Sequence, residues 1–187
     1  MLNYNSSLPE KKSFQDIQMT EIYPIMKLNL RGKKREFMSA VGKSLNLLLP
    51  TESNTSTRSN TLTALWLSPD EWMIFSNEKI DIMSNEYKTE NLLMNKISKI
   101  NLGAVTDVTD QFVLINLKGN KIYELFQTGS PYNFNNFKKK KGAVTQTILA
   151  KIDVIIHNQD LNNVNLFVRR SFSQHLYSWM SDSASRL

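Results

Sequence analysis

Strand-like segments in this sequence come mostly in pairs, and a single helix-like segment separates each pair from the next. Short-range alternation of apolar and polar residues predicts strands, and apolar residues three and four positions apart predict helices. The resulting order is β-α-β-β-α-β-β-α-β-β-α. This order lacks the strict alternation of a parallel doubly wound sheet, so it predicts an α+β fold. We expect mostly antiparallel sheets with helices packed on one face, in a split β-α-β arrangement.

Local patterns place the expected elements. Ser68-Pro69-Asp70-Glu71 predicts a hairpin turn, because proline fixes φ at the second turn position. Gly129 is expected in the left-handed conformation after a short helix. Phe172 and Trp179 are expected on the inner face of the last helix, and core positions are favoured for all three tryptophans. The expected strands are 22–30, 65–67, 72–75, 105–108 paired with 112–117, 144–156 and 164–169; the expected helices are 36–49, 85–100, 122–126 and 171–180.

The size of the chain favours a single domain. Its 187 residues are 41% hydrophobic, which is enough for a substantial core. The polar segment 1–20 is expected to be a loosely ordered arm, followed by one α+β domain over 21–187. Within that domain, 21–102 and 103–187 could form two small sub-lobes. The sequence has no cysteine and no apolar stretch near the ~20 residues that span a bilayer, so we expect a cytoplasmic protein.

The residue patterns that carry catalytic chemistry are incomplete here. Gly42-Lys43-Ser44 matches the end of a phosphate-binding loop, but Phe37 stands where that loop needs glycine and the tripeptide lies within a predicted helix. His157 and His175 are the only histidines, whereas catalytic zinc usually has three protein ligands. A packed or half-exposed side chain is the favoured interpretation of His175. We therefore expect no catalytic, cofactor-binding or metal-binding residues on this chain.

Asp107 and Asp110 have two interpretations. Carboxylates this close in sequence could share a proton or hold a ligand amine. Aspartates at the end of a strand more often accept hydrogen bonds from the backbone of a turn. The turn interpretation is favoured.

One run of lysines, Lys138–Lys141, dominates the charge of the chain. Without it the formal net charge of +6 falls to 6 − 4 = +2. Aromatic residues beside lysines can stack on bases while the lysines bind phosphates, so RNA binding is one interpretation. A solvated loop is favoured, because the other basic residues are scattered. The aromatic residues that precede the run are Tyr132, Phe134 and Phe137.

Several short motifs occur in a fixed order along the chain. They are Leu28-Asn29-Leu30-Arg31-Gly32, Leu48-Leu49-Pro50, Leu65-Trp66-Leu67-Ser68-Pro69-Asp70-Glu71-Trp72, Asp107-Val108-Thr109-Asp110, Leu117-Lys118-Gly119, Thr145-Gln146-Thr147 and Arg170-Ser171-Phe172 with Trp179. With them, residues 22–182 resemble the gamma subunit of heterotetrameric sarcosine oxidase. The sequence departs from that family at Tyr132-Asn133-Phe134, where the family tends to have an aspartate, and at the lysine run.

The resemblance implies a fold similar to the folate-binding part of the glycine-cleavage aminomethyltransferase. It also implies a non-catalytic role in the oxidative demethylation of sarcosine to glycine, in one-carbon metabolism. FAD, FMN, NAD and tetrahydrofolate are then expected on the alpha, beta and delta partner subunits, with the gamma subunit packed against alpha. Two alternatives remain open: a stand-alone folate-binding or tRNA-modifying relative that uses Asp107, and a basic RNA-binding module that uses Lys138–Lys141.

Overall fold

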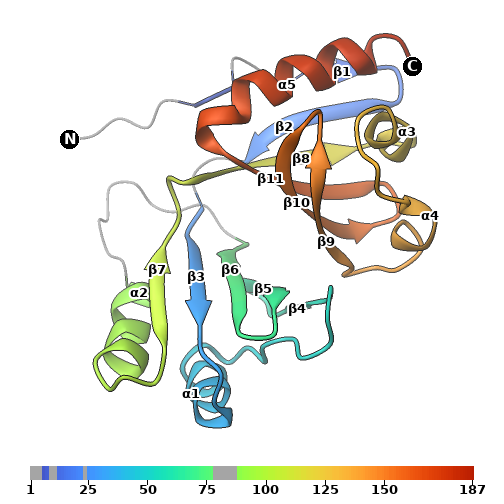
Figure 1. Ribbon diagram of the computed structural model, residues 1–187. Coiled ribbons are helices and arrows are strands. Elements are labelled where there is room, and N and C mark those ends of the chain that lie inside the picture. Colours follow the sequence, from blue (N-terminus) through green and yellow to red (C-terminus); the bar gives the residue numbers. More distant parts are fainter. Residues whose placement is uncertain (1–5, 9–11, 23–24, 78–87) are drawn as a thin grey trace. The chain divides into compact units, whose positions relative to one another are not determined.

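The structure is a computed structural model that describes residues 6–8, 12–22, 25–77 and 88–187. Residues 24–109 form one compact unit, and residues 1–23 with 110–187 form the other. Each unit is built on one antiparallel sheet, which confirms the α+β fold class (Figure 1). The boundaries differ from the expected sub-lobes at 21–102 and 103–187, because the N-terminal segment joins the sheet of the C-terminal half.

The sheet of the unit at 24–109 has the strand order β4-β5-β6-β3-β7. Its strands are β3 (Lys27–Arg31), β4 (Ser56–Arg58), β5 (Leu62–Ser68), β6 (Glu71–Ser76) and β7 (Ala104–Asp107). Its helices are α1 (Arg35–Leu45), α2 (Lys88–Leu93) and the π-helical η1 (Met94–Ser98). The core of this unit joins buried residues of the helices, such as Phe37 and Ile97, to Leu30 and Ile74 of the sheet. The predicted hairpin is present as β5 and β6.

Phe37 at the start of α1 packs directly against the backbone of two glycines, where any side chain would collide with its ring. A Cβ atom built on Gly32 would lie 2.4 Å from Cγ of the Phe37 ring, and one built on Gly103 would lie 2.6 Å from its Cδ2. Phe37 is fully buried at 0% exposure. The two glycines therefore leave room for the ring that anchors α1.

Helix α1 ends earlier than expected. It stops at Leu45, because Asn46 adopts the left-handed conformation at φ 49° and ends the helix as glycine often does. Beyond it Leu47 and Leu49 are buried, whereas Leu48 is 80% exposed. The prediction that 36–49 is one helix is wrong, since the last apolar residues alternate between buried and exposed as in an extended segment.

The sheet of the second unit has the strand order β1-β2-β8-β11-β10-β9. Its strands are β1 (Lys12–Phe14), β2 (Ile17–Ile22), β8 (Phe112–Lys118), β9 (Val144–Leu149), β10 (Ile152–Asp160) and β11 (Asn163–Arg169). Its helices are α3 (Ile122–Gln127), α4 (Phe134–Phe137) and α5 (Arg170–Ala184). Residues of all three helices share one core with alternate residues of the strands.

The N-terminal segment is part of this sheet. We expected a loose arm over 1–20, but the structure places Lys12–Phe14 and Ile17–Ile22 in strands, with Met19 in register with Leu117 of β8. Ile17 and Met19 are 2% and 0% exposed. Burial of these two alternate side chains accounts for the order of the segment.

The expected strand pair 105–108 and 112–117 is wrong. Strand β7 pairs with β3, while β8 pairs with β2 and β11 in the other sheet. The division between the two units falls between Thr109 and Asp110, so the chain passes from one sheet to the other at this turn.

The segment expected as one long β stretch at 144–156 is a hairpin. Strands β9 and β10 pair from Ile152 with Leu149 to His157 with Val144. The turn between them uses Ala150 and Lys151, whose φ values are 52° and 66°. Positive φ at both central residues gives the twist that suits a two-residue hairpin loop.

Two expectations around the last helix are wrong. Gly129 is not among the residues with positive φ; it is needed because a Cβ there would lie 2.4 Å from the Trp179 ring. Phe172 is 49% exposed rather than inward, because the buried stripe of α5 follows Ser173, Leu176, Tyr177 and Met180. Of the tryptophans, Trp72 lies in a core, and Trp66 and Trp179 are partly buried and pack against one.

Candidate functional site

The turn of the β5–β6 hairpin is fixed by its own polar side chains. The Ser68 hydroxyl donates to Oδ1 of Asp70 at 2.8 Å, and the Asp70 carbonyl accepts from the Gly32 amide at 3.0 Å. The hydrogen bond from Ser68, followed by the charges of Lys33 and Arg31, holds the pKa of Asp70 below its usual value. The Asp70 carboxylate is thus engaged within the turn.

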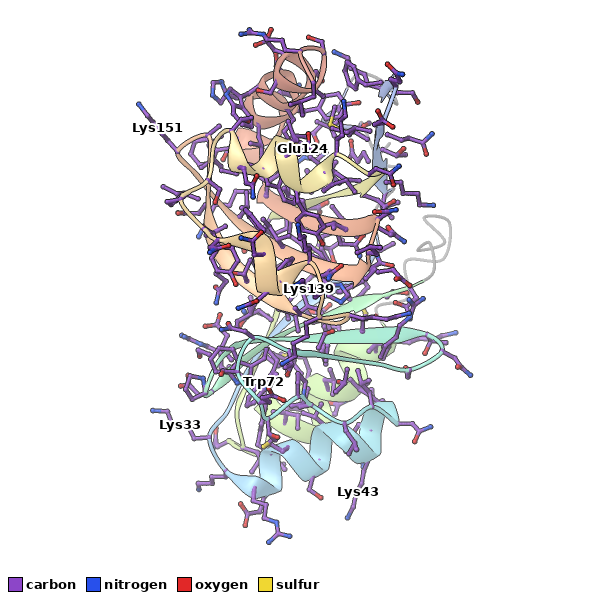
Figure 2. The ribbon with its side chains drawn as sticks, turned by 90° about the vertical axis from the view of Figure 1, so that its right-hand side faces the viewer. Lys33, Lys43, Trp72, Glu124, Lys139 and Lys151 are labelled. Atoms are coloured by element: carbon purple, nitrogen blue, oxygen red, sulfur yellow. The ribbon has the colours of Figure 1, made fainter. Side chains whose placement is uncertain are left out.

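The next two residues attach the hairpin to its surroundings. Glu71 accepts from the Asn29 amide at 2.7 Å and from the Arg31 guanidinium at 2.9 Å, both on neighbouring β3. Trp72 is 2% exposed, and its indole Nε1 donates to the Pro50 carbonyl at 2.8 Å. Figure 2 shows Trp72 among the side chains between this sheet and α1. The hairpin motif therefore has a structural role at every polar position.

The Asp107 region also serves the fold. Oδ1 of Asp107 accepts from the Thr109 amide at 2.8 Å, and the Thr109 hydroxyl accepts from the Lys27 amide at 3.0 Å. These bonds join the end of β7 to the start of β3, so the turn interpretation of Asp107 holds. Burial, then the nearby charge of Asp107, raises the pKa of Glu90. Asp110 is exposed and begins the other unit.

The residues considered for catalysis lie on different elements of the fold. Gly42-Lys43-Ser44 is inside α1, and Lys43 projects away from that helix (Figure 2), so no phosphate loop forms. His175 is exposed on α5, whereas His157 on β10 is 5% exposed. Among the residues described, no three His, Asp, Glu or Cys side chains lie close enough together to hold a metal ion.

His157 lies at one end of a row of polar side chains that crosses the sheet, and this row is not predicted by the sequence. Strand register places it opposite Asn165 of β11, which in turn lies opposite Asn116 of β8. The Asn116 amide donates to Oδ1 of Asn165 at 3.0 Å and to Oδ1 of Asn163 at 2.7 Å. The asparagines thus satisfy one another across the sheet.

An open hollow of about 620 Å³ lies between β1 and α5. Two of the three serines on its helix side already donate hydrogen bonds within α5: Ser181 donates to the Tyr177 carbonyl and Ser185 to the Asp182 carbonyl. Asp182 pairs with Arg186, and this contact lowers the pKa of its carboxyl group. The hollow is consequently a poor candidate for a cofactor site.

The segment before the lysine run forms an aromatic cluster. Asn133 caps α4, because its side-chain carbonyl accepts a hydrogen bond from the Asn135 amide at 3.0 Å. The rings of Tyr123, Phe126, Phe134 and Phe137 lie 5.4–6.3 Å apart, and burial raises the pKa of Tyr123 to about 12. Packing of this cluster fixes the position of the backbone that leads into Lys138.

The lysine run itself is an ordered turn. Asn158 of β10 is 1% exposed, and its amide donates to the carbonyls of Phe137 at 2.9 Å, Lys140 at 3.0 Å and Lys138 at 3.4 Å. Figure 2 labels Lys139 beside α4. The favoured solvated loop is therefore also a rigid one.

The comparisons with known proteins agree with one family. The family model described as sarcosine oxidase, gamma subunit family matches residues 31–186. The chain belongs to the sarcosine oxidase gamma subunit family. A search of curated proteins finds no match. Across the described helices, none is both long and apolar enough to cross a bilayer.

Solved structures share the fold of this gamma-family chain. A chain of the heterotetrameric sarcosine oxidase from Corynebacterium sp. U-96, in complex with pyrrole 2-carboxylate, is 19% identical with a TM-score of 0.80, and the match covers 91% of this chain and 84% of that one. The glycine cleavage system aminomethyltransferase T from Bartonella henselae is 13% identical with a TM-score of 0.61, covering 88% and 45%. The predicted likeness to the aminomethyltransferase fold is confirmed.

Proposed function

We propose that this chain is the non-catalytic gamma subunit of a heterotetrameric sarcosine oxidase. The assembly would convert sarcosine, oxygen and water into glycine, formaldehyde and hydrogen peroxide, or pass the methyl carbon to tetrahydrofolate. Membership of the gamma subunit family over residues 31–186 carries the proposal. The motif acids Asp70, Glu71 and Asp107 support it, because each is engaged in a structural hydrogen bond.

The cofactors belong, in this proposal, to the partner subunits. FAD, FMN, NAD and tetrahydrofolate would bind the alpha, beta and delta subunits, and this chain would pack against alpha in the cytoplasm. A stand-alone folate-binding role is not favoured, since Asp107 is exposed and its carboxylate closes a turn. An RNA-binding role is not favoured, since two of the three aromatic residues before the lysine run, Phe134 and Phe137, are 0% and 4% exposed and so cannot stack on bases.

Co-expression tests the proposal. The chain purified alone should be colourless and should consume no oxygen with sarcosine, whereas the chain expressed with the three partner subunits should co-elute with them and with flavin absorbance. Demethylation of sarcosine by the isolated chain would refute the non-catalytic role. Heat of tetrahydrofolate binding to the isolated chain, measured by calorimetry, would favour the folate-binding alternative.

A further inference from the structure

The turn at Lys138–Lys141 concentrates positive charge with little compensation from the fold. The stretch 128–152 contains five lysines and no acidic residue. Asp160 of β10 pairs with Lys141 at 3.0 Å, and for Lys138 and Lys139 no ion pair is found with any residue that the structure describes. Neighbouring like charges repel one another, so the run is unfavourable for the isolated turn. The charges of Lys138 and Lys139 are therefore available to an external anion.

The turn presents these charges in a fixed geometry. Besides the three hydrogen bonds from the Asn158 side chain, the Asn158 backbone carbonyl accepts from the Gly142 amide at 2.8 Å and its amide donates to the Ala143 carbonyl at 2.9 Å. Gly142 has a φ of 78°, which suits the sharp exit into β9. A preorganised surface loses little conformational entropy when it binds, so this turn is suited to docking.

Apolar side chains flank the charges. Tyr132 is 36% exposed, and its ring packs 6.0 Å from that of Phe137, which directly precedes Lys138. Leu161 is 60% exposed, and its amide donates to the same Asp160 carboxylate that pairs with Lys141. We call the set Tyr132, Lys138–Lys141 and Leu161 the lysine corner. Apolar anchors beside a charged rim are typical of protein–protein interfaces.

The aromatic geometry argues for a protein partner over a nucleic acid. Single-stranded nucleic acids bind where bases can stack on open aromatic faces. Tyr132 makes T-shaped contacts with Phe134 and Phe137, at interplanar angles of 68° and 89°, and these two partners are buried, so the cluster offers no series of open rings for successive bases. One short turn of lysines is also too compact to follow a phosphate backbone. We propose that the lysine corner docks on an acidic surface of a partner subunit, an inference that rests on the proposed function.

The rate of assembly tests this inference. The full chain and a variant with Lys138–Lys141 all replaced by Gln are mixed with the alpha, beta and delta subunits at low and at high salt. Charges at the edge of an interface act mainly on the association rate, so the variant should associate about tenfold more slowly at low ionic strength and depend less on salt. The matched control replaces four exposed lysines of the other unit, Lys34, Lys43, Lys96 and Lys99, by Gln and should associate like the wild type.

A second variant separates charge from apolar contact. Leu161→Ser should raise the dissociation rate and leave the association rate and its salt dependence unchanged. Circular dichroism of each variant checks that it is folded. If the wild-type chain fails to join the partner subunits, the proposed function itself fails. If the wild type joins them and the quadruple variant matches it in both association rate and salt dependence, the docking role of the lysine corner is refuted while the proposed function stands. Binding of single-stranded RNA by the wild type, lost in the quadruple variant, would also refute the docking role.

Discussion

Gly32→Ala tests the packing of α1 on its sheet. The added Cβ would lie 2.4, 2.5 and 2.8 Å from three atoms of the Phe37 ring, closer than the 3.0 Å below which something must shift. The ring is fully buried and packs closely on Gly103 as well, where an added Cβ would lie only 2.6 Å from it, so the ring has little room to shift. Overpacking of this kind costs typically about 1–3 kcal/mol, and we expect the upper part of that range.

Two further variants make the expectation specific. Gly42→Ala is the same chemical change inside α1, where the nearest atom is the Leu47 carbonyl oxygen at 3.7 Å. It should stabilise the chain by about 0.5–1 kcal/mol, as alanine does in helix interiors. Phe37→Leu removes the ring that the new Cβ would meet. In that background Gly32→Ala should cost at least about 1 kcal/mol less than in the wild type, a coupling that a double-mutant cycle measures.

Urea unfolding followed by far-ultraviolet circular dichroism and by tryptophan fluorescence gives these free energies. Trp72 is a local probe, since its ring lies 5.8 Å from that of Phe37. The comparison is valid where the slope of free energy against denaturant stays constant among variants. A Gly32→Ala chain as stable as the Gly42→Ala chain, or strict additivity with Phe37→Leu, would refute the packing argument.

Three other variants test separate features. Asn158→Ala withdraws an amide from three carbonyls and should destabilise the chain by about 2–3 kcal/mol in urea unfolding. Replacing Ala150-Lys151 by Asn-Gly puts residues that adopt positive φ at lower steric cost into this turn. The change should raise Tm by several degrees, equivalent to about 1–2 kcal/mol. Burial raises the pKa of Tyr123 to about 12, so the unfolded chain ionises first and stability is lost as pH rises from about 10 to 12. Tyr123→Phe should reduce this alkaline loss, and it should cost little at neutral pH because no described residue bonds the hydroxyl.

Local chemistry accounts for what the sequence predicts well. The β5–β6 hairpin can be predicted from the sequence because Pro69 sets the turn and apolar residues lie on both sides of it. The turn role of Asp107 can also be predicted, because an aspartate at the end of a strand can accept a hydrogen bond from the backbone amide two residues later. Neither conclusion needs a contact distant in the sequence.

Features that depend on distant contacts could not be predicted in this way. The order of Ile17 and Met19 comes from pairing with β8, about a hundred residues later. The role of Gly129 depends on the Trp179 ring, and the rigidity of the lysine run depends on Asn158. The β9–β10 turn could not be predicted from local sequence, because Ala150 and Lys151 occupy positions where glycine or asparagine is usual.

The residues that carry the family resemblance differ from those that we assign to assembly. Gly32, Asp70, Glu71 and Trp72 act on the fold of one unit, through the Phe37 ring, the hairpin turn and the Pro50 carbonyl. In the lysine corner, by contrast, the side chains of Lys138 and Lys139 form no ion pair with any residue that the structure describes. Substitutions in the first set should therefore change the stability of the isolated chain, and substitutions in the second should change the rate at which it joins its partners.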